Sequence, residues 1–361
     1  MTDDRVPKSG SAARLHLLPL ARRAAGSLGL EPFAARYVVP RLPLADPSLD
    51  VVRGAERRLA EQLAEIRSSN RPIVVGPWLA EVGIELLYWV PFLRALRLDP
   101  SRVVAVSRGG VDSWYAGIAE GYADVFEHVG EDEFRKELSH SWIDQEGQKQ
   151  YRVGDFDRRV LVSVAKRNGL ANPHVLHPST MLMLFSEYWR NRIPLARVLR
   201  YLDIAPLTPP AVSLDLPERY VAARFYFRET FPDDAANRAL VGQLLELLGR
   251  DLPVVLLDTG VNIDDHEQVP IPPEVEVLRP LLGVRAEENL RLQSVVLAGA
   301  DSFAGTYGGL CYLANAYGVP SFALLTPPAS EPGLRHGAIG RRIATSAGTH
   351  LSIVSTTAVS A

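Results

Sequence analysis

The chain has 361 residues, of which 47% are hydrophobic and 22% charged, with a net charge of −3 and a pI near 6.3. This composition can fill large cores, and the length favours two globular domains over one. The small negative charge argues against the broad basic surface that nucleic-acid phosphates require, so no nucleic-acid partner is expected. A single cysteine, Cys311, excludes an intrachain disulfide and is expected to be a buried structural thiol.

The N-terminus does not resemble a secretory signal, because acidic residues come first and Pro19 interrupts the apolar run. No other stretch approaches the roughly 20 apolar residues of a membrane span, and we therefore expect a cytoplasmic protein. The basic and apolar segment from Arg14 to Arg23 is a candidate for weak peripheral contact with a membrane, and a packed N-terminal helix is the alternative.

Helix and strand patterns alternate along the chain, which predicts parallel sheets covered by helices. In the first part, helices are expected over 53–69 and 83–96, and strands over 72–78 and 102–108. Two further helices, over 155–169 and 179–192, are expected to be joined by the turn HVLHP. Prolines at 206, 209, 210 and 217 rule out a long regular element and mark a linker.

Beyond the linker the pattern is more regular. Strands are expected over 219–227, 253–259, 275–281, 300–306 and 320–325, and helices over 235–250, 286–300 and 309–318. The sequence thus predicts an α/β fold of two Rossmann-like domains, 1–205 and 218–361, with a cleft between them and a helical segment in the first domain.

The segment DSFAGTYGGL, from Asp301 to Leu310, combines a strand end, a small-residue turn and a helix start. Glycines allow close approach to the backbone, and a helix start offers free N–H groups and partial positive charge to an anion. Thr306, Tyr307, Gly308 and Gly309 are therefore the strongest phosphate-binding candidates.

The run ADSFAGTYGGLCYLANAYGVPSFALL resembles the donor-domain signature of GT-B glycosyltransferases. Further similarity, in PWLAEVGIELLYWVPFLR, HVLHPSTMLMLFSEYW and YVAARFYFRETFPD, is to bacterial proteins encoded with polysaccharide genes and, more distantly, to the fucosyltransferase and heptosyltransferase groups. The resemblance spans about residues 70 to 330. It implies a nucleotide-sugar donor bound by the second domain and a glycan or lipid-linked acceptor received by the first.

Glu81 and Glu85 follow a predicted strand, at the edge where open α/β sheets collect ligands. Either carboxylate could take the proton of an acceptor hydroxyl, which is a base's task in sugar transfer. The structural alternative is that the Glu81 carboxylate interacts favourably with the helix dipole and that Glu85 pairs with a cation such as Arg94 or Arg97.

Arg224 and Arg228 project from one face if their strand continues that far, and a guanidinium fork suits a diphosphate. The fucosyltransferase relatives carry a basic R-x-R-like strand end, whereas this chain has three residues between its arginines and lacks the expected histidine. The alternative for either arginine is an ion pair with Glu229 or Asp233.

His177 precedes a turn and could act as a base or hold a phosphate, and a satisfied structural histidine is the alternative. Asp258 and Asp301 lie at predicted sheet edges, where they could hold donor hydroxyls or cap turns. The D-x-D at Asp155 and Asp157 precedes a helix and is interpreted as an N-cap, so no metal site is predicted.

These residues together predict a metal-independent glycosyltransferase with no cofactor, using a nucleotide-sugar as substrate. Two alternatives remain open at this point. A nucleotide-sugar epimerase would turn over its substrate without an acceptor, and a non-catalytic binding protein would bind the donor and form no product.

Overall fold

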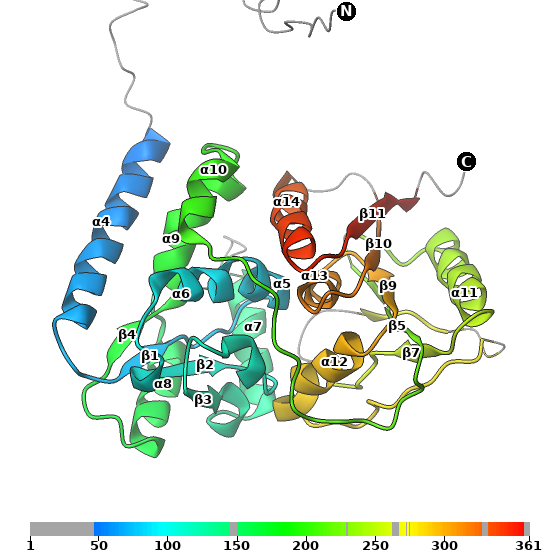
Figure 1. Cartoon of the computed structure of the whole chain (residues 1–361), viewed down its shortest axis with the longest axis horizontal. Helices are drawn as coiled ribbons and strands as arrows, with labels where there is room; N and C mark the ends of the chain where they lie inside the picture. The colour runs from blue at the N-terminus through cyan, green and yellow to red at the C-terminus, as the bar shows by residue number, and fades with distance from the viewer. Residues whose placement is uncertain are drawn as a thin grey trace, which may run out of the picture. The chain divides into compact units, whose positions relative to one another are not determined.

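Two parallel sheets organise the part of the chain that the computed structural model describes, which comprises residues 47–143, 150–228, 230–261, 267–271, 273, 275–326 and 331–356. Val51–Ala361 cluster as one unit and Met1–Asp50 as another, and the arrangement below is that of the larger unit. Its first half (residues 51–205) and second half (residues 218–356) each contain one of the parallel sheets (Figure 1).

The first sheet has the order β3-β2-β1-β4, and all its strands run parallel. The strands are β1 (Ile73–Val75), β2 (Val103–Ser107), β3 (Gly121–Asp124) and β4 (His174–Leu176). The helices are α4 (Pro47–Arg67), α5 (Val82–Ile84), the π-helix η1 (Glu85–Trp89), α6 (Val90–Leu96), α7 (Glu131–Ile143), α8 (Asp155–Arg167), α9 (Pro178–Trp189) and α10 (Leu195–Val198). Short 3-10 turns are η2 (Pro100–Arg102), η3 (Asp112–Tyr115), η4 (Val125–Glu127) and η5 (Leu199–Tyr201).

The second sheet has the order β11-β10-β9-β5-β7 and is also parallel. Its strands are β5 (Val221–Arg224), β7 (Val254–Leu256), β9 (Ser302–Thr306), β10 (Ser321–Leu325) and β11 (Leu351–Ser355). A short antiparallel pair joins β6 (Tyr226–Phe227) to β8 (Glu267–Gln268). The helices are α11 (Ala235–Gly249), η6 (Ala286–Glu288), α12 (Asn289–Ala298), α13 (Gly309–Ala316) and α14 (Glu331–Ser346).

Strands β1 and β7 are short apolar runs buried on both faces, as expected for parallel sheets covered by helices. In the first half, Val74 and Val106 pack with aromatic residues of α7 and α8, and in the second half Ala223 and Leu256 pack with α11. The predicted α/β class with two Rossmann-like units is thereby confirmed.

Several predicted elements differ from the structure. Residues 174–176 of the predicted turn HVLHP form β4, and β3 was not predicted at all. Of the strand predicted over 275–281, only an isolated bridge between Leu278 and Val255 forms. The second sheet does not end at β10, because α14 and β11 follow. These elements are short or amphipathic, and their pairing partners are distant in the sequence.

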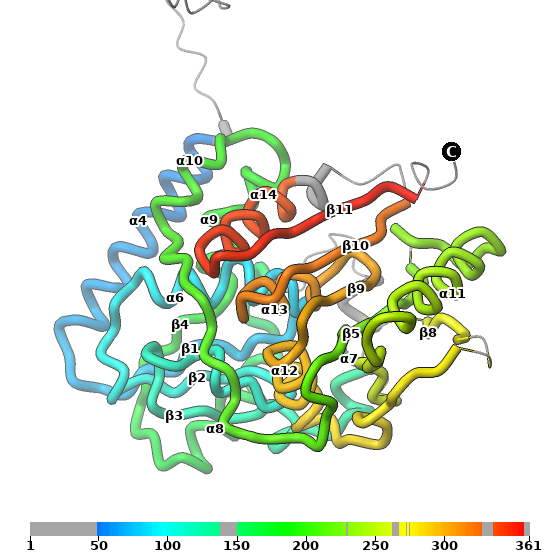
Figure 2. Tube along the Cα trace, turned by 45° about the vertical axis from the view of Figure 1, so that its right-hand side comes forward, coloured from blue at the N-terminus to red at the C-terminus, as the bar shows by residue number. Residues whose placement is uncertain are grey.

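The segment between Leu202 and Tyr220 contains no helix or strand, as its prolines predicted. Figure 2 shows it as one extended stretch from α10 to β5. The domain limits 1–205 and 218–361 and the cleft between the domains stay predictions. The segment from Arg14 to Arg23 lies outside the described residues.

Helices of the two halves pack against one another directly. Helix α5 contacts α13, and α14, which is near the end of the chain, contacts η1 and α9 of the first half. The Tyr88 hydroxyl lies 2.9 Å from His336 Nδ1, and the Tyr188 hydroxyl donates to the Arg335 carbonyl over 3.1 Å. Helix α14 therefore contributes to the packing of the second half against the first.

Candidate functional site

The topology of the second sheet indicates where a ligand binds. From β5 the chain moves to β7 on one side, and it then returns to β9, β10 and β11 on the other. In parallel sheets of this kind, ligands bind outside the carboxyl ends of the strands where the strand order reverses. That point lies between the ends of β5 and β9.

Thr306, at the end of β9, joins these two strand ends. Its hydroxyl donates to the Tyr226 carbonyl over 3.0 Å and accepts from the Tyr226 N–H over 3.1 Å. Thr306 and Tyr307 are both buried, and the Tyr307 hydroxyl accepts a hydrogen bond from Tyr312 over 2.5 Å. Both residues lie at the predicted place, but their side chains have structural partners there.

The glycines of the turn are needed because other parts of the protein occupy the space beside them. A Cβ added to Gly308 would lie 2.0 Å from the Tyr226 hydroxyl, and one added to Gly309 would lie 2.9 Å from the Gly83 nitrogen. A Cβ on Gly305 would lie 2.3 Å from the Arg224 carbonyl oxygen. The absent side chains thus make room for protein, whereas residues 308–310 at the start of α13 remain half-exposed.

Replacing Gly308 by alanine is expected to lower the free energy of unfolding by about 1–3 kcal/mol, the usual cost of overpacking. Because the clashing atom is a hydroxyl, the double variant with Tyr226→Phe should recover part of that loss. Urea unfolding of the two single variants and the double variant would measure the coupling. Additive losses in the double variant would contradict this explanation of the glycine.

Arg224, Asp258 and Arg279 form an ion cluster at the same edge. The Asp258 carboxylate is buried, binds the Arg224 guanidinium through one oxygen and accepts from Arg279 Nη1 over 2.9 Å through the other. Two guanidinium groups share one carboxylate, so the cluster carries net positive charge.

The ion pair of Arg224 differs from the one that the sequence suggested. Asp258, 34 residues away along the chain, binds the guanidinium, whereas Asp233 accepts from Arg238 Nε over 2.5 Å. Glu229, the other suggested partner, lies outside the described residues. Nearness in sequence was therefore a poor guide to this contact, which forms between the ends of two neighbouring strands, β5 and β7.

Arg228 and Asp301 lie at opposite edges of the sheet. Arg228 follows β6, is half-buried, and its backbone pairs with that of Phe231 in a tight turn. Asp301 precedes β9, and its carboxylate accepts from Arg219 Nε over 3.1 Å. Because parallel strands begin at one edge and end at the other, Asp301 does not join the other predicted donor-binding residues.

Glu81 lies where the two halves meet. It is exposed and directly precedes α5, whose Val82 and Gly83 touch Gly309 at the start of α13. The carboxyl end of β1 and the carboxyl end of β9 therefore meet through these residues. Of the predicted catalytic residues, Glu81 is the one that the structure leaves exposed beside the helix start.

Glu85 is fully buried four residues later. Its Oε1 accepts from the Ser107 hydroxyl over 2.5 Å and from the Tyr115 hydroxyl over 2.6 Å. Oε2 accepts no hydrogen bond from the described residues and lies 3.7 Å from Arg108 Nη1. Burial raises the pKa of Glu85 from 4.5 to about 7, although the Arg108 charge opposes that rise.

The expected partners of Glu85, Arg94 and Arg97, are engaged elsewhere. Arg94 donates to the carbonyl oxygens of Asp203 and Ala205. Arg97 lies 3.8 Å from the Asp203 carboxylate. The alternative that pairs Glu85 with either arginine is therefore wrong, and the cation is Arg108.

The turn that carries Arg108 also contacts the second half. Gly109 and Gly110 have φ values of 78° and 74°, and the Gly109 carbonyl accepts from the Arg291 N–H over 2.8 Å. Asp124 accepts from the Gly110 N–H over 2.7 Å, and burial raises its pKa to about 6. Sequence reasoning missed this acidic cluster, although the pair Gly109-Gly110 after a predicted strand was a usable signal.

His177 lies at the reversal point of the first sheet, between β1 and β4, but it is buried. Its Nδ1 accepts from the Ser179 N–H over 3.1 Å, and its Nε2 lies 3.2 Å from Asp157 Oδ1. Gln150 donates to the same Asp157 oxygen and to the Pro77 carbonyl. His177 is therefore buried and bonded to other residues of the first half, whereas Glu81 is exposed.

Asp155 and Asp157 lie in the first turn of α8, and neither is its N-cap residue, so that part of the sequence interpretation is wrong. The N-cap residue of α8 is Gly154, and Asp157 reaches back to accept its N–H over 2.7 Å. Asp155 pairs with Arg158. Within the described residues, no three or more His, Cys, Asp and Glu side chains group as metal ligands would.

Cys311 is buried and donates to the Gly308 carbonyl over 2.8 Å, which confirms a structural thiol. Burial raises its pKa to about 12. Among the described helices, none has the length and apolarity needed to cross a bilayer.

No protein-family model and no curated protein matches the chain. Among solved structures, it is similar to a glycosyl transferase family 9 protein from Veillonella parvula, with 13% identity over 80% of this chain and 87% of the other and a TM-score of 0.41. It is also similar to the E. coli ADP-heptose LPS heptosyltransferase II, with 13% identity over 79% of this chain and 90% of the other and a TM-score of 0.40. A third similar structure is the iron-containing dodecameric glycosyltransferase TibC of enterotoxigenic E. coli, with 12% identity and a TM-score of 0.39. The match covers 71% of this chain and 58% of TibC, so the chain spans little more than half of that protein.

Proposed function

We propose that this protein is a glycosyltransferase that moves a hexosyl or deoxyhexosyl group from a nucleotide-sugar to a hydroxyl of a glycan or lipid-linked acceptor. The observation that carries the proposal is that the carboxyl ends of the strands in the first sheet lie next to those in the second sheet. The exposed Glu81 of the first half adjoins the half-exposed helix start at Gly308 and Gly309 of the second. A transfer reaction needs a base for one substrate and an anion site for the leaving group of the other.

In the proposed reaction, the nucleotide-sugar diphosphate lies at the start of α13, where the helix dipole and free N–H groups favour negative charge. Arg228 and the net positive cluster of Arg224, Asp258 and Arg279 add positive charge at the same edge. These groups would stabilise the leaving diphosphate without a metal ion. Thr306 and Tyr307 hold the strand end and helix start in place rather than contacting phosphate.

Glu81 is the proposed base. Its carboxylate takes the proton of the acceptor hydroxyl as the acceptor oxygen bonds to the anomeric carbon, and the bond from that carbon to the diphosphate breaks. Glu85 and His177 are buried and bonded within the protein, and we assign them positioning roles in the first half. We place the reaction in the cytoplasm, in polysaccharide or glycoconjugate biosynthesis.

Release of nucleoside diphosphate from a panel of GDP-, UDP-, dTDP-, CDP- and ADP-linked sugars tests the proposal. We expect one nucleotide class to release diphosphate, and the release to accelerate when glycan or lipid-linked acceptors are added. Interconversion of nucleotide-sugars without release would instead indicate an epimerase. Binding with neither product would indicate a non-catalytic protein.

A further inference from the structure

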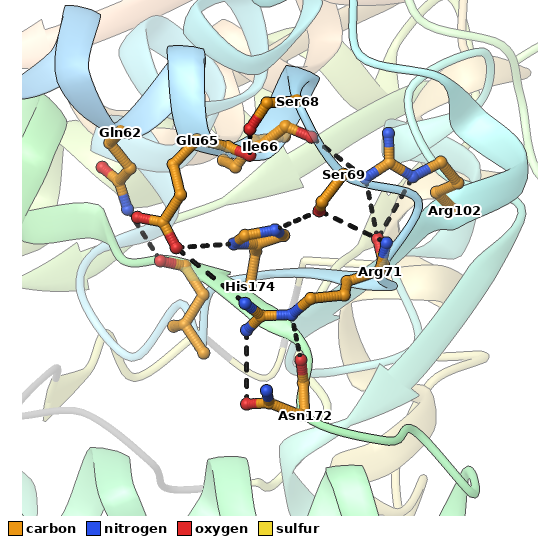
Figure 3. A network of polar contacts seen from close by, with 10 residues as sticks. Gln62, Glu65, Ile66, Ser68, Ser69, Arg71, Arg102, Asn172 and His174 are labelled. Atoms are coloured by element: carbon orange, nitrogen blue, oxygen red, sulfur yellow. Dashed lines mark hydrogen bonds and ion pairs between the residues drawn. The ribbon is translucent and has the colours of Figure 1, made fainter.

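A second polar cluster lies at the opposite edge of the first sheet, away from the carboxyl strand ends. It joins the last turn of α4, the loop before β1 and the first residue of β4 (Figure 3). Its central residues are Glu65, Ser69 and His174, which come from these three segments in turn. The proposed transfer reaction uses none of them.

The three side chains are arranged in series. The Ser69 hydroxyl lies 2.6 Å from His174 Nε2, and His174 Nδ1 lies 3.5 Å from Glu65 Oε1. A carboxylate beside Nδ1 favours the tautomer that carries its proton there. Nε2 then presents a lone pair to the Ser69 hydroxyl, which is the orientation in which a histidine accepts a proton from serine.

The surroundings fix the loop that carries Ser69. Arg71 donates to the carbonyl and the side-chain oxygen of Asn172 over 2.6 and 3.2 Å, and Arg102 donates to the Arg71 carbonyl over 2.8 Å. Asn172 itself has a φ of 46°, a conformation in which asparagine is commoner than most residues. The serine and histidine are therefore held by strand, helix and loop together.

Accessibility and charge also suit a reactive serine. Ser69 is half-exposed and Asn70 is exposed, whereas His174 is 6% exposed. Burial, aided by the Arg71 charge, lowers the pKa of His174, so the imidazole is neutral at pH 7 and able to accept a proton.

We propose that Ser69, His174 and Glu65 form a nucleophile, base and orienting carboxylate that hydrolyse carboxylic esters at the amino edge of the first sheet. Ser69 Oγ bonds to the ester carbonyl carbon while its proton passes to His174 Nε2. The ester C–O bond then breaks, and the leaving alcohol takes that proton. Water attacks the acyl-serine in the same way, so ester and water yield acid and alcohol.

A purely structural network has the same contacts but an unreactive serine, and covalent labelling separates the two. The folded full-length protein is treated with a fluorophosphonate probe, and the labelled peptide is mapped by mass spectrometry. We expect the label on Ser69. An unlabelled Ser69, with the protein folded as judged by circular dichroism, would overturn the proposal without the use of any variant.

Variants then test the roles. Ser69→Ala and His174→Gln should each abolish labelling and lower the rate of p-nitrophenyl acetate hydrolysis at least 100-fold. Ser68→Ala is the matched control, because its hydroxyl donates to the Glu65 carbonyl and not to the histidine. Labelling that persists in His174→Gln would contradict the role of the base.

Glu65 is a positioning residue, and its test needs a readout that loss of structure would not give. The carboxylate raises the pKa of His174, so Glu65→Gln should lower the apparent pKa in the pH profile of the labelling rate. An unchanged profile would exclude Glu65 from the arrangement.

Discussion

The free energy of unfolding is expected to fall by about 3 kcal/mol as the pH rises from 4.5 to 7, through Glu85 alone. Burial raises the pKa of this carboxyl in the folded protein to about 7, whereas the unfolded chain keeps the ordinary value of 4.5. Between these two values the folded state binds more protons than the unfolded state. Stability due to this group is therefore full below pH 4.5 and lost as the pH approaches 7.

Glu85→Gln is the variant that tests this effect, because glutamine resembles the protonated carboxyl and keeps an oxygen for Ser107 and Tyr115. Urea unfolding at pH 5 and pH 8 should show a smaller loss of stability in the variant than in the wild type. Asp124, whose pKa is raised to about 6, also makes the free energy of unfolding fall as the pH rises, and Asp124→Asn should reduce this remaining pH dependence. Equal pH dependence in wild type and Glu85→Gln would contradict the role of burial.

Glu81→Gln is expected to lower the turnover number for sugar transfer by about 10²–10⁴-fold, the usual contribution of a general base. Because Glu81 is exposed and its side chain caps no N–H group of α5, the melting temperature should change little. Diphosphate release with saturating donor and acceptor is the measurement.

Glu120→Gln is the matched control for that experiment, since Glu120 is an exposed carboxylate in the same half that precedes β3. It should keep the wild-type rate. Full activity in Glu81→Gln would remove Glu81 as the base.

Much of the architecture could be predicted from the sequence, because long apolar runs and amphipathic periods fix strands and helices locally. The runs that became β1, β2, β9 and β10 are of this kind. The three-residue β4 has no such signal, since its start, His174, is polar and its formation depends on pairing with β1. Short strands of this type are determined by tertiary contacts.

The candidate site could be predicted less well, because its residues meet across distances that no local pattern encodes. The glycines at 308 and 309 were expected to admit a ligand, yet their neighbours are Tyr226 and Gly83. The structural alternative for Glu85 was an ion pair with Arg94 or Arg97, and its partners instead come from β2 and the turns after it. Residue type indicated which side chains carry charge or polar groups, but the partner of each side chain could be known only from the three-dimensional structure.

Thermal-shift measurement with the nucleotide-sugar panel tests the central claim most directly, because a ligand that binds only the folded state raises its melting temperature. The wild type is compared with Arg228→Ala, at the carboxyl edge of the second sheet, and with Arg219→Ala, which removes the partner of Asp301 at the amino edge. We predict that one nucleotide class raises the melting temperature of the wild type and of Arg219→Ala, and that Arg228→Ala loses this shift. No shift with any nucleotide-sugar, or a shift lost only in Arg219→Ala, would contradict a donor site between β5 and β9.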